Sequence, residues 1–160
     1  MIGHGGHGKD TAGRMLGRVL RCGAISSSAY AAERAVWPIV AARGLWPDWR
    51  AMHADRGMHR EMWFHAIRAY NLAPGASLAE QILAERAIYV GMRSREEFAA
   101  ARGLFDCVIW IDAGRRLPIE DPSSMELEQC DADRVLDNNG TEADLARGVA
   151  ALALALRAHE

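Results

Sequence analysis

The first eleven residues carry the pattern with the clearest chemistry. Gly3, Gly8 and Lys9 fit the spacing G-x-x-x-x-G-K-[ST], in which glycines let backbone N–H groups turn around phosphate oxygens and the lysine reaches the β- and γ-phosphates. Apolar residues at helical spacing follow, so we expect a helix from Lys9 to Arg21 whose positive end faces the phosphates. The pattern predicts a nucleoside triphosphate site.

The lysine of this pattern is the chain's only one. Lysine and arginine together number 19, and 18 of them are arginine. A bias towards arginine that spares Lys9 indicates a position where a flexible ammonium group is required and a planar guanidinium fits badly.

The pattern departs from the usual one in two places. Asp10 stands where the magnesium-binding hydroxyl belongs, and Thr11 follows it. A carboxylate is a good ligand for a hard cation, so we expect Asp10 to hold Mg²⁺ directly or through water, with Thr11 as the alternative. Only Met1 and Ile2 precede the loop, so the strand that normally feeds it is a stub, or residues upstream are missing.

Composition indicates an ordinary soluble protein. The 160 residues suit one domain, residues 1–160, with half the residues apolar and a quarter charged. The net charge of −2 argues against a generally basic nucleic-acid binder, although not against a local arginine-lined groove. Three cysteines without paired spacing favour reduced thiols in the cytoplasm, that of the host if the source is viral. No apolar run approaches about 18 residues, so we expect no membrane insertion.

Short apolar runs alternate with helical patterns along the chain. We expect strands at Cys22–Ser26, Ala87–Val90, Cys107–Ile111 and Arg134–Leu136. The predicted helices include one over Ala29–Trp37 that stops or kinks at Pro38 and two that begin with capping boxes, Ser77 with Glu80 and Ser94 with Glu97. The alternation predicts a three-layer α/β/α protein with a central, mostly parallel sheet, and the glycine loop at its start adds the expectation of a P-loop NTPase fold.

Ligands of such sheets bind beyond the carboxyl ends of the strands. We therefore expect four segments to meet in one crevice: Gly3–Thr11, Ser26–Ser28, Gly91–Arg95 and Asp112–Arg116. Asp112 to Asp131 is predicted to be a long loop.

The segment Asp48–Tyr70 is rich in tryptophan, methionine and arginine. A helical period predicts a buried face made of Met58, Met62, Trp63, Ala66, Ile67 and Tyr70. Arg56 and Arg60 lie four residues apart and can grip a phosphate, while Trp63 can stack on a base. The alternative is a solvated arginine face over a core of tryptophan and methionine.

The rest of the chain narrows the class of phosphate-binding protein. A GTPase needs a base-reading motif such as N-K-x-D, which a chain without a second lysine lacks. A motor ATPase usually carries an acidic residue at a strand end, yet Ala87–Val90 is followed by Gly91 and Arg93. A kinase neutralises the transferring phosphoryl group with cations, a role that suits Arg93, Arg115 and Arg116.

Several segments together resemble a known family. They are Gly8–Thr11, Ile88–Phe98, Val108–Asp112 and Asp137–Thr141. This ordered set resembles the bacteriophage P-loop kinases of the deoxynucleoside monophosphate kinase-like group, which includes the 5-hydroxymethyluracil DNA kinases and is related to thymidylate kinases. The similarity covers most of the chain and is poorly specific for the substrate.

The resemblance implies the fold of nucleoside monophosphate kinases and ATP- and Mg²⁺-dependent phosphorylation. The acceptor is either the hydroxymethyl group of 5-hydroxymethyluracil in phage DNA, activated for hypermodification of thymine, or a free deoxynucleoside monophosphate. The residues expected at ATP are Gly5, Gly6, His7, Gly8, Lys9, Asp10, Thr11, Arg115 and Asn138, with Lys9, Asp10 and Arg93 catalytic. Those expected at the acceptor are Ser27, Arg34, Arg56, Arg60, Trp63 and Arg93. The general base is unassigned among Asp10, Glu33, Asp55 and Asp112.

Size favours DNA as the acceptor. Free-nucleotide kinases close a lid over both substrates, and Asp112–Asp131 looks too proline-rich for a helical lid. A short, open enzyme suits a polymer whose target base is flipped out of the stack. A catalytically silent module that binds nucleotide or nucleic acid is the alternative from another class.

Overall fold

The computed structural model describes residues 1–158. Its helices are α1 (Lys9–Leu20), α2 (Ser27–Ala31), α3 (Trp37–Val40), α4 (Trp49–Ala54), α5 (Arg60–Leu72), α6 (Leu78–Glu85), α7 (Arg95–Ala101) and α8 (Glu142–Arg157). Its strands are β1 (Ala24–Ser26), β2 (Ile88–Val90), β3 (Ile109–Asp112) and β4 (Arg134–Asp137). Short helical turns cover Ala32–Val36, Ala41–Arg43, Arg56–His59, Arg102–Leu104 and Gln129–Asp131.

The strands form two separate parallel pairs. β1 pairs with β2, with Ala24 opposite Ile88, and β3 pairs with β4, with Ile109 opposite Arg134. Helices account for 56% of the chain. The predicted P-loop NTPase fold with a central sheet is therefore wrong: the structure has two short two-stranded sheets among helices.

The first two residues bond to one strand of each pair. Met1 bonds to β2, its amine donating to Tyr89 O at 2.6 Å and its carbonyl accepting from Gly91 N. Ile2 bonds to β3, with 2.9 Å from its N–H to Ile109 O. Two residues make only an isolated bridge, to Trp110, and not a strand.

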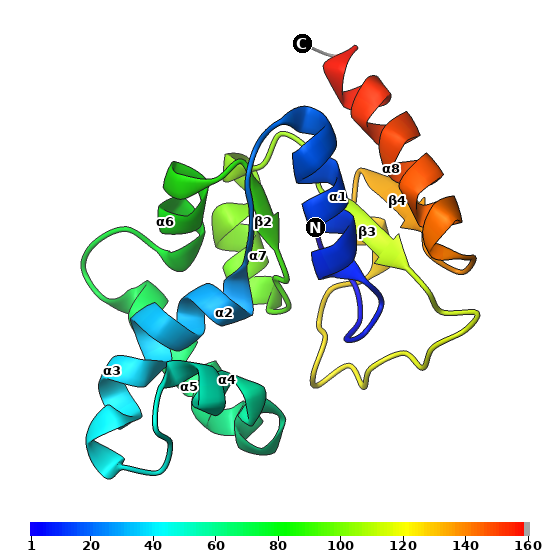
Figure 1. Cartoon of the computed structure of the whole chain (residues 1–160). Coiled ribbons are helices and arrows are strands. Elements are labelled where there is room, and N and C mark those ends of the chain that lie inside the picture. The colour runs from blue at the N-terminus through cyan, green and yellow to red at the C-terminus, as the bar shows by residue number, and fades with distance from the viewer. Residues whose placement is uncertain (159–160) are drawn as a thin grey trace.

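The helix that follows the glycine loop lies in the middle of the molecule. α1 packs against α8 and β2, and Figure 1 shows α1 and α8 side by side next to β3 and β4. Its buried residues Ala12 and Leu16 belong to a core that includes Val90, Ile111 and Val149. This packing fixes the direction in which the start of α1 points.

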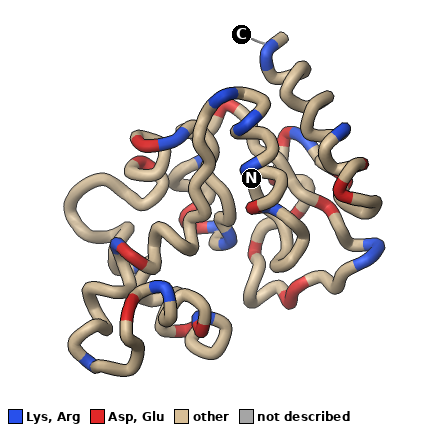
Figure 2. Tube along the Cα trace, viewed as in Figure 1, with Lys and Arg blue, Asp and Glu red and all other residues tan. Residues whose placement is uncertain are grey.

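A second core lies among the helices from α2 to α7. Val36, Met52, Trp63 and Ile82 are buried there, and Figure 1 shows α3, α4 and α5 as a group at the lower left. Acidic and basic residues are interspersed along the trace in Figure 2 rather than segregated by sign.

The predicted helices of this region are wrong in detail. Pro38 does not stop the helical path: it lies in the first turn of α3, which directly follows the π-helical turn Ala32–Val36. The predicted long helical face of Asp48–Tyr70 is broken at residues 55–59. Met58 is consequently 81% exposed, whereas Trp63 and Ala66 are buried as predicted.

Capping predictions fared better because they depend on local contacts. Ser77 with Glu80 forms the predicted capping box. Ser94 accepts from Glu97 N, but the Glu97 carboxylate accepts from Tyr89 Oη instead of completing the box.

The close approach of α1 to the turn after it can be tested at Gly17. A Cβ there would lie 2.8 Å from the backbone oxygen of Cys22, so we expect Gly17→Ala to lower the free energy of unfolding by about 1–3 kcal/mol despite alanine's higher helix propensity. Gly103→Ala is the control, since nothing lies within 4 Å of its Cβ. Urea unfolding measures both, and equal destabilisation of the two variants would contradict the packing.

Candidate anion-binding site

The glycine loop turns tightly into α1. Gly6 and Gly8 have φ of 74° and 92°, a conformation that side chains rarely adopt, and Gly8 is the N-cap of α1. A Cβ at Gly8 would lie 2.4 Å from Asn138 Nδ2, and one at Gly3 would lie 2.7 Å from Ile111 O. Glycine is therefore required at Gly3 and Gly8 by both conformation and space, and at Gly6 by conformation alone. The free N–H groups of the first turn of α1 follow directly.

The Lys9 side chain folds back over this turn. Its Nζ donates to Gly3 O at 2.8 Å and to His4 O at 2.6 Å, and the residue is 9% exposed. Burial, then the nearby charge of Arg93, lowers the pKa of Lys9 from 10.5 to about 8. An ammonium group has three donors, so these two carbonyls leave one N–H for another acceptor.

A carboxylate that the sequence did not single out lies on the loop. Glu120 accepts from Gly5 N at 2.5 Å, and Arg93 Nη1 is 2.8 Å from both of its oxygens. Arg60 Nη1 lies 3.8 Å from Glu120 and donates to Ser124 Oγ. Burial alone would raise the pKa of Glu120, but the hydrogen bonds from Arg93 and Gly5 outweigh it and hold the pKa below its usual value.

Residues 113–124, here called the strap, are held across the loop by two histidines. His7 is fully buried; its Nδ1 accepts from Ala113 N at 3.2 Å and its Nε2 is 3.2 Å from Pro118 O. His4 Nδ1 accepts from Glu120 N at 3.2 Å. The side chains of both histidines thus position the strap, whereas the sequence suggested only a backbone role at ATP for His7.

Asn138 and Arg115, both expected at ATP, have other partners. Asn138 is buried, and its Nδ2 donates to His7 O at 2.8 Å, which braces the loop from behind. Arg115 is exposed and pairs with Asp137 at 2.8 Å. Asn138 is therefore a positioning residue, and Arg115 makes a surface ion pair beside it.

The expected magnesium ligands lie in the first turn of α1. Asp10 is exposed and its charge reaches Lys9, while Thr11 Oγ1 accepts from Arg14 at 3.2 Å. Within residues 1–158 no three His, Cys, Asp or Glu side chains are grouped to hold a metal. One carboxylate fits Mg²⁺ that is bound mainly by phosphate and water, the usual arrangement in phosphoryl-transfer sites.

The expected acceptor residues are only partly brought together. Arg60 and Arg93 meet at Glu120, and Ser27 is buried with its Oγ 3.1 Å from the Cβ position of Gly91. Arg34 instead lies over the Tyr30 ring.

The remaining acceptor candidates cluster around His53. Arg56 Nη1 donates to His53 O at 2.8 Å, and the ring of Trp63 lies 5.9 Å from that of His53. His53 Nε2 is 3.1 Å from Ser28 Oγ, and burial, then Arg56, lowers the pKa of His53. The Nε1 of Trp63 is buried and has no hydrogen-bond partner among the described residues.

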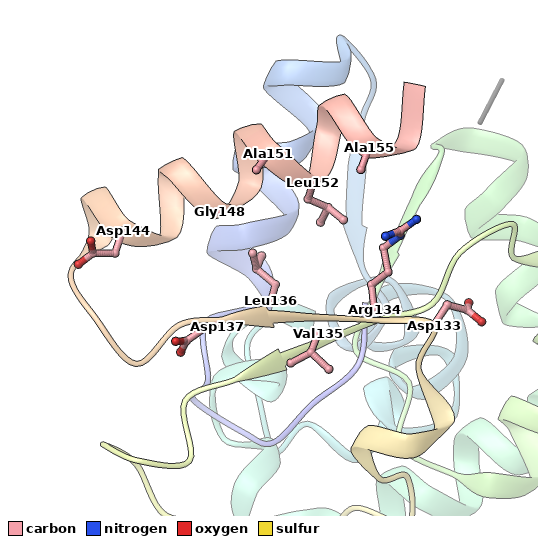
Figure 3. Close-up of a pocket in the computed structure, with 10 residues that line it drawn as sticks. All are labelled: Asp133, Arg134, Val135, Leu136, Asp137, Asp144, Gly148, Ala151, Leu152 and Ala155. Carbon is pink, nitrogen blue, oxygen red and sulfur yellow. The ribbon is translucent and has the colours of Figure 1, made fainter. Parts of the chain in front are cut away.

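A separate groove lies away from the loop. It has a volume of about 610 Å³ and runs between β4 and α8 (Figure 3). Leu136, Leu152 and Ala155 give it an apolar floor, and Asp137 and Asp144 lie at one end. Lys9, Arg93 and Glu120 do not line it, so it is separate from the anion-binding site.

We find no match to this chain among protein-family models, curated proteins or solved structures. Function must therefore be argued from the site. No helix within residues 1–158 is both long and apolar enough to cross a bilayer.

The environment of the sole lysine gives a direct test. Protein labelled with [¹³C]lysine has one lysine Cε resonance, and we expect it to titrate with a midpoint at about 8 because burial and Arg93 disfavour the ammonium form. The same titration in urea, where the environment is lost, should return a midpoint at about 10.4. A folded-state midpoint above 10 would contradict a buried Lys9.

Proposed function

We propose that this protein is an ATP-dependent phosphotransferase that phosphorylates the hydroxymethyl group of 5-hydroxymethyluracil in phage DNA. The observation that carries phosphoryl transfer is the Lys9 ammonium, held over a glycine turn at the start of α1 with the Arg93 guanidinium close enough to lower its pKa. Backbone donors, an ammonium and a guanidinium are the groups that stabilise a transferring phosphoryl. The acceptor is inferred from the resemblance of the sequence to the DNA kinases.

Each group has a distinct part in this proposal. The N–H groups of the glycine turn and the start of α1 bind the phosphate chain of ATP, and the third N–H of Lys9 reaches its terminal oxygens. Arg93 offsets the charge that moves from the γ-phosphate to the acceptor. When bound, Mg²⁺ supplies further positive charge at the phosphates, with Asp10 and Thr11 as the protein groups that would hold it.

The transfer also requires removal of a proton. The bond between the γ-phosphorus and the bridging oxygen breaks, a bond to the hydroxymethyl oxygen forms, and the hydroxyl proton passes to a base. Four carboxylates were considered as the base from the sequence, and Asp10 is the one nearest to the glycine turn along the chain. Two of the others already accept hydrogen bonds: Asp55 from Trp46 and Asp112 from Asn139.

A deoxynucleoside monophosphate kinase is the second candidate. It is favoured by one observation, that Arg60 and Arg93 approach the same carboxylate of Glu120. Two guanidiniums that converge on a carboxylate are also placed to bind the phosphate of a free nucleotide. The two candidates differ in the acceptor and share the site for ATP.

The sole lysine is the decisive variant for ATP. Lys9→Met keeps most of the stem but removes the ammonium, and we expect phosphate transfer to fall at least about 100-fold, the loss typical for a removed oxyanion donor. The assay offers radiolabelled ATP with hydroxymethyluracil DNA, with thymine DNA and with each deoxynucleoside monophosphate. Label that appears only on free monophosphates would exclude the DNA kinase and favour the deoxynucleoside monophosphate kinase. Binding of ATP without any label transfer would indicate a silent module.

Arg60 tests the acceptor side. Arg60→Ala should raise the KM for the acceptor about tenfold and leave the KM for ATP nearly unchanged, because its guanidinium lies on the side of Glu120 away from the Gly5 contact. Arg68→Ala, on the same helix and paired with Glu96, is the matched control. Equal KM values in both variants would remove Arg60 from the site.

A further inference from the structure

The partners of the Glu120 carboxylate are the groups that a phosphate would use. Gly5 N–H and Arg93 Nη1 donate to it, and the charge of Lys9 lowers its pKa. The Cβ position of Gly5 lies only 3.0 Å from Glu120 Oε1, so the carboxylate sits directly on the turn. Its side chain is 16% exposed and therefore largely sheltered from water.

We propose that Glu120 is an internal anion that competes with phosphate for the glycine turn, so that the strap is an autoinhibitory lid. The strap opens when a phosphate chain displaces the carboxylate. This inference rests on the proposed function only in taking the turn as a phosphate site; it does not require catalysis.

Competition follows from charge and hydrogen bonding. Gly5 has a single backbone N–H group, which can bond closely to one acceptor at a time. A carboxylate and a phosphate that shared donors would also repel each other strongly in a sheltered site. Both anions cannot occupy the Gly5 N–H and the Nη1 donors of Arg93 at once. Glu120 must therefore leave before these donors can reach phosphate.

The contacts of the strap define which part moves. The fully buried side chain of His7 is hydrogen-bonded to the backbone of Ala113 and Pro118. A bound phosphate does not compete for these two hydrogen bonds. Beyond Pro118 the strap is attached to the loop through Glu120, whose N–H bonds to His4, and to Arg93 through Ser124 O. We therefore place the moving part at residues 119–124, hinged after Pro118.

A competitor of this kind lowers the apparent affinity for phosphate. The apparent dissociation constant is the intrinsic one divided by the fraction of molecules with an open strap. Removing the competitor should tighten binding of inorganic tripolyphosphate by about tenfold, within the range usual for coupled equilibria. The probe carries no base or sugar, so the measurement reports on the turn alone.

Calorimetry with tripolyphosphate on the full chain tests the competition. Glu120→Gln and Glu120→Ala should bind about tenfold more tightly than wild type. Asp121→Asn is the control: it removes the same charge one residue away, where the carboxylate accepts from Ser123. Tightening no greater than in Asp121→Asn, or no binding to either Glu120 variant, would overturn the proposal.

Hydrogen exchange separates displacement from simple repulsion. In wild type, tripolyphosphate should slow exchange in residues 3–9 and speed it severalfold in residues 119–124, while residues 113–118 change little. Protection of the strap together with the loop would mean that it closes over the anion with Glu120 in place, and would overturn the proposal. If Glu120 competes with tripolyphosphate but no phosphate is transferred from ATP, this inference holds and the proposed kinase activity is wrong.

Discussion

The burial of the Lys9 ammonium on its own turn is the constraint on which the site depends. Removing a charged ammonium from water is costly, and Gly3 O and His4 O compensate only while the turn keeps its shape. Asn138 holds that shape by bonding to His7 O, and the space it takes excludes any side chain at Gly8. The glycine spacing is thus needed for the lysine's own carbonyl contacts as well as for approach to a ligand.

Local signals in the sequence predicted local structure well. The capping residues Ser77 and Ser94 begin α6 and α7 as expected, because each cap accepts from the backbone three residues further on. The sheet failed for the opposite reason. Whether pairs of strands join into one sheet depends on pairing between distant segments, and here Met1 and Ile2 bond to both pairs without forming a strand. Apolar periodicity carries no information on that point.

The residues of the site also differ in whether local sequence signals could predict them. Spacing alone identified Gly3, Gly8 and Lys9, which lie within one turn of the chain. Glu120 was not predicted from the sequence, because it contacts Gly5 across 115 residues and lies in a segment without apolar periodicity. The histidines offered a usable signal: two imidazoles in a glycine loop are unusual, and a buried imidazole needs partners for two nitrogens. Such partners had to come from a distant segment, here the strap.

The balance of charge separates the site from the rest of the surface. Arg95 with Asp131 and Arg102 with Asp133 are one-to-one pairs. Around Glu120 one carboxylate faces Arg60, Arg93 and Lys9, and Asp10 adds a second negative charge near Lys9, so three positive charges meet two negative charges and an excess of one remains. A chain of net charge −2 thus concentrates positive charge at one turn. Because Glu120 neutralises only part of that charge, a polyanion with several negative oxygens gains more from the cluster than the single carboxylate does.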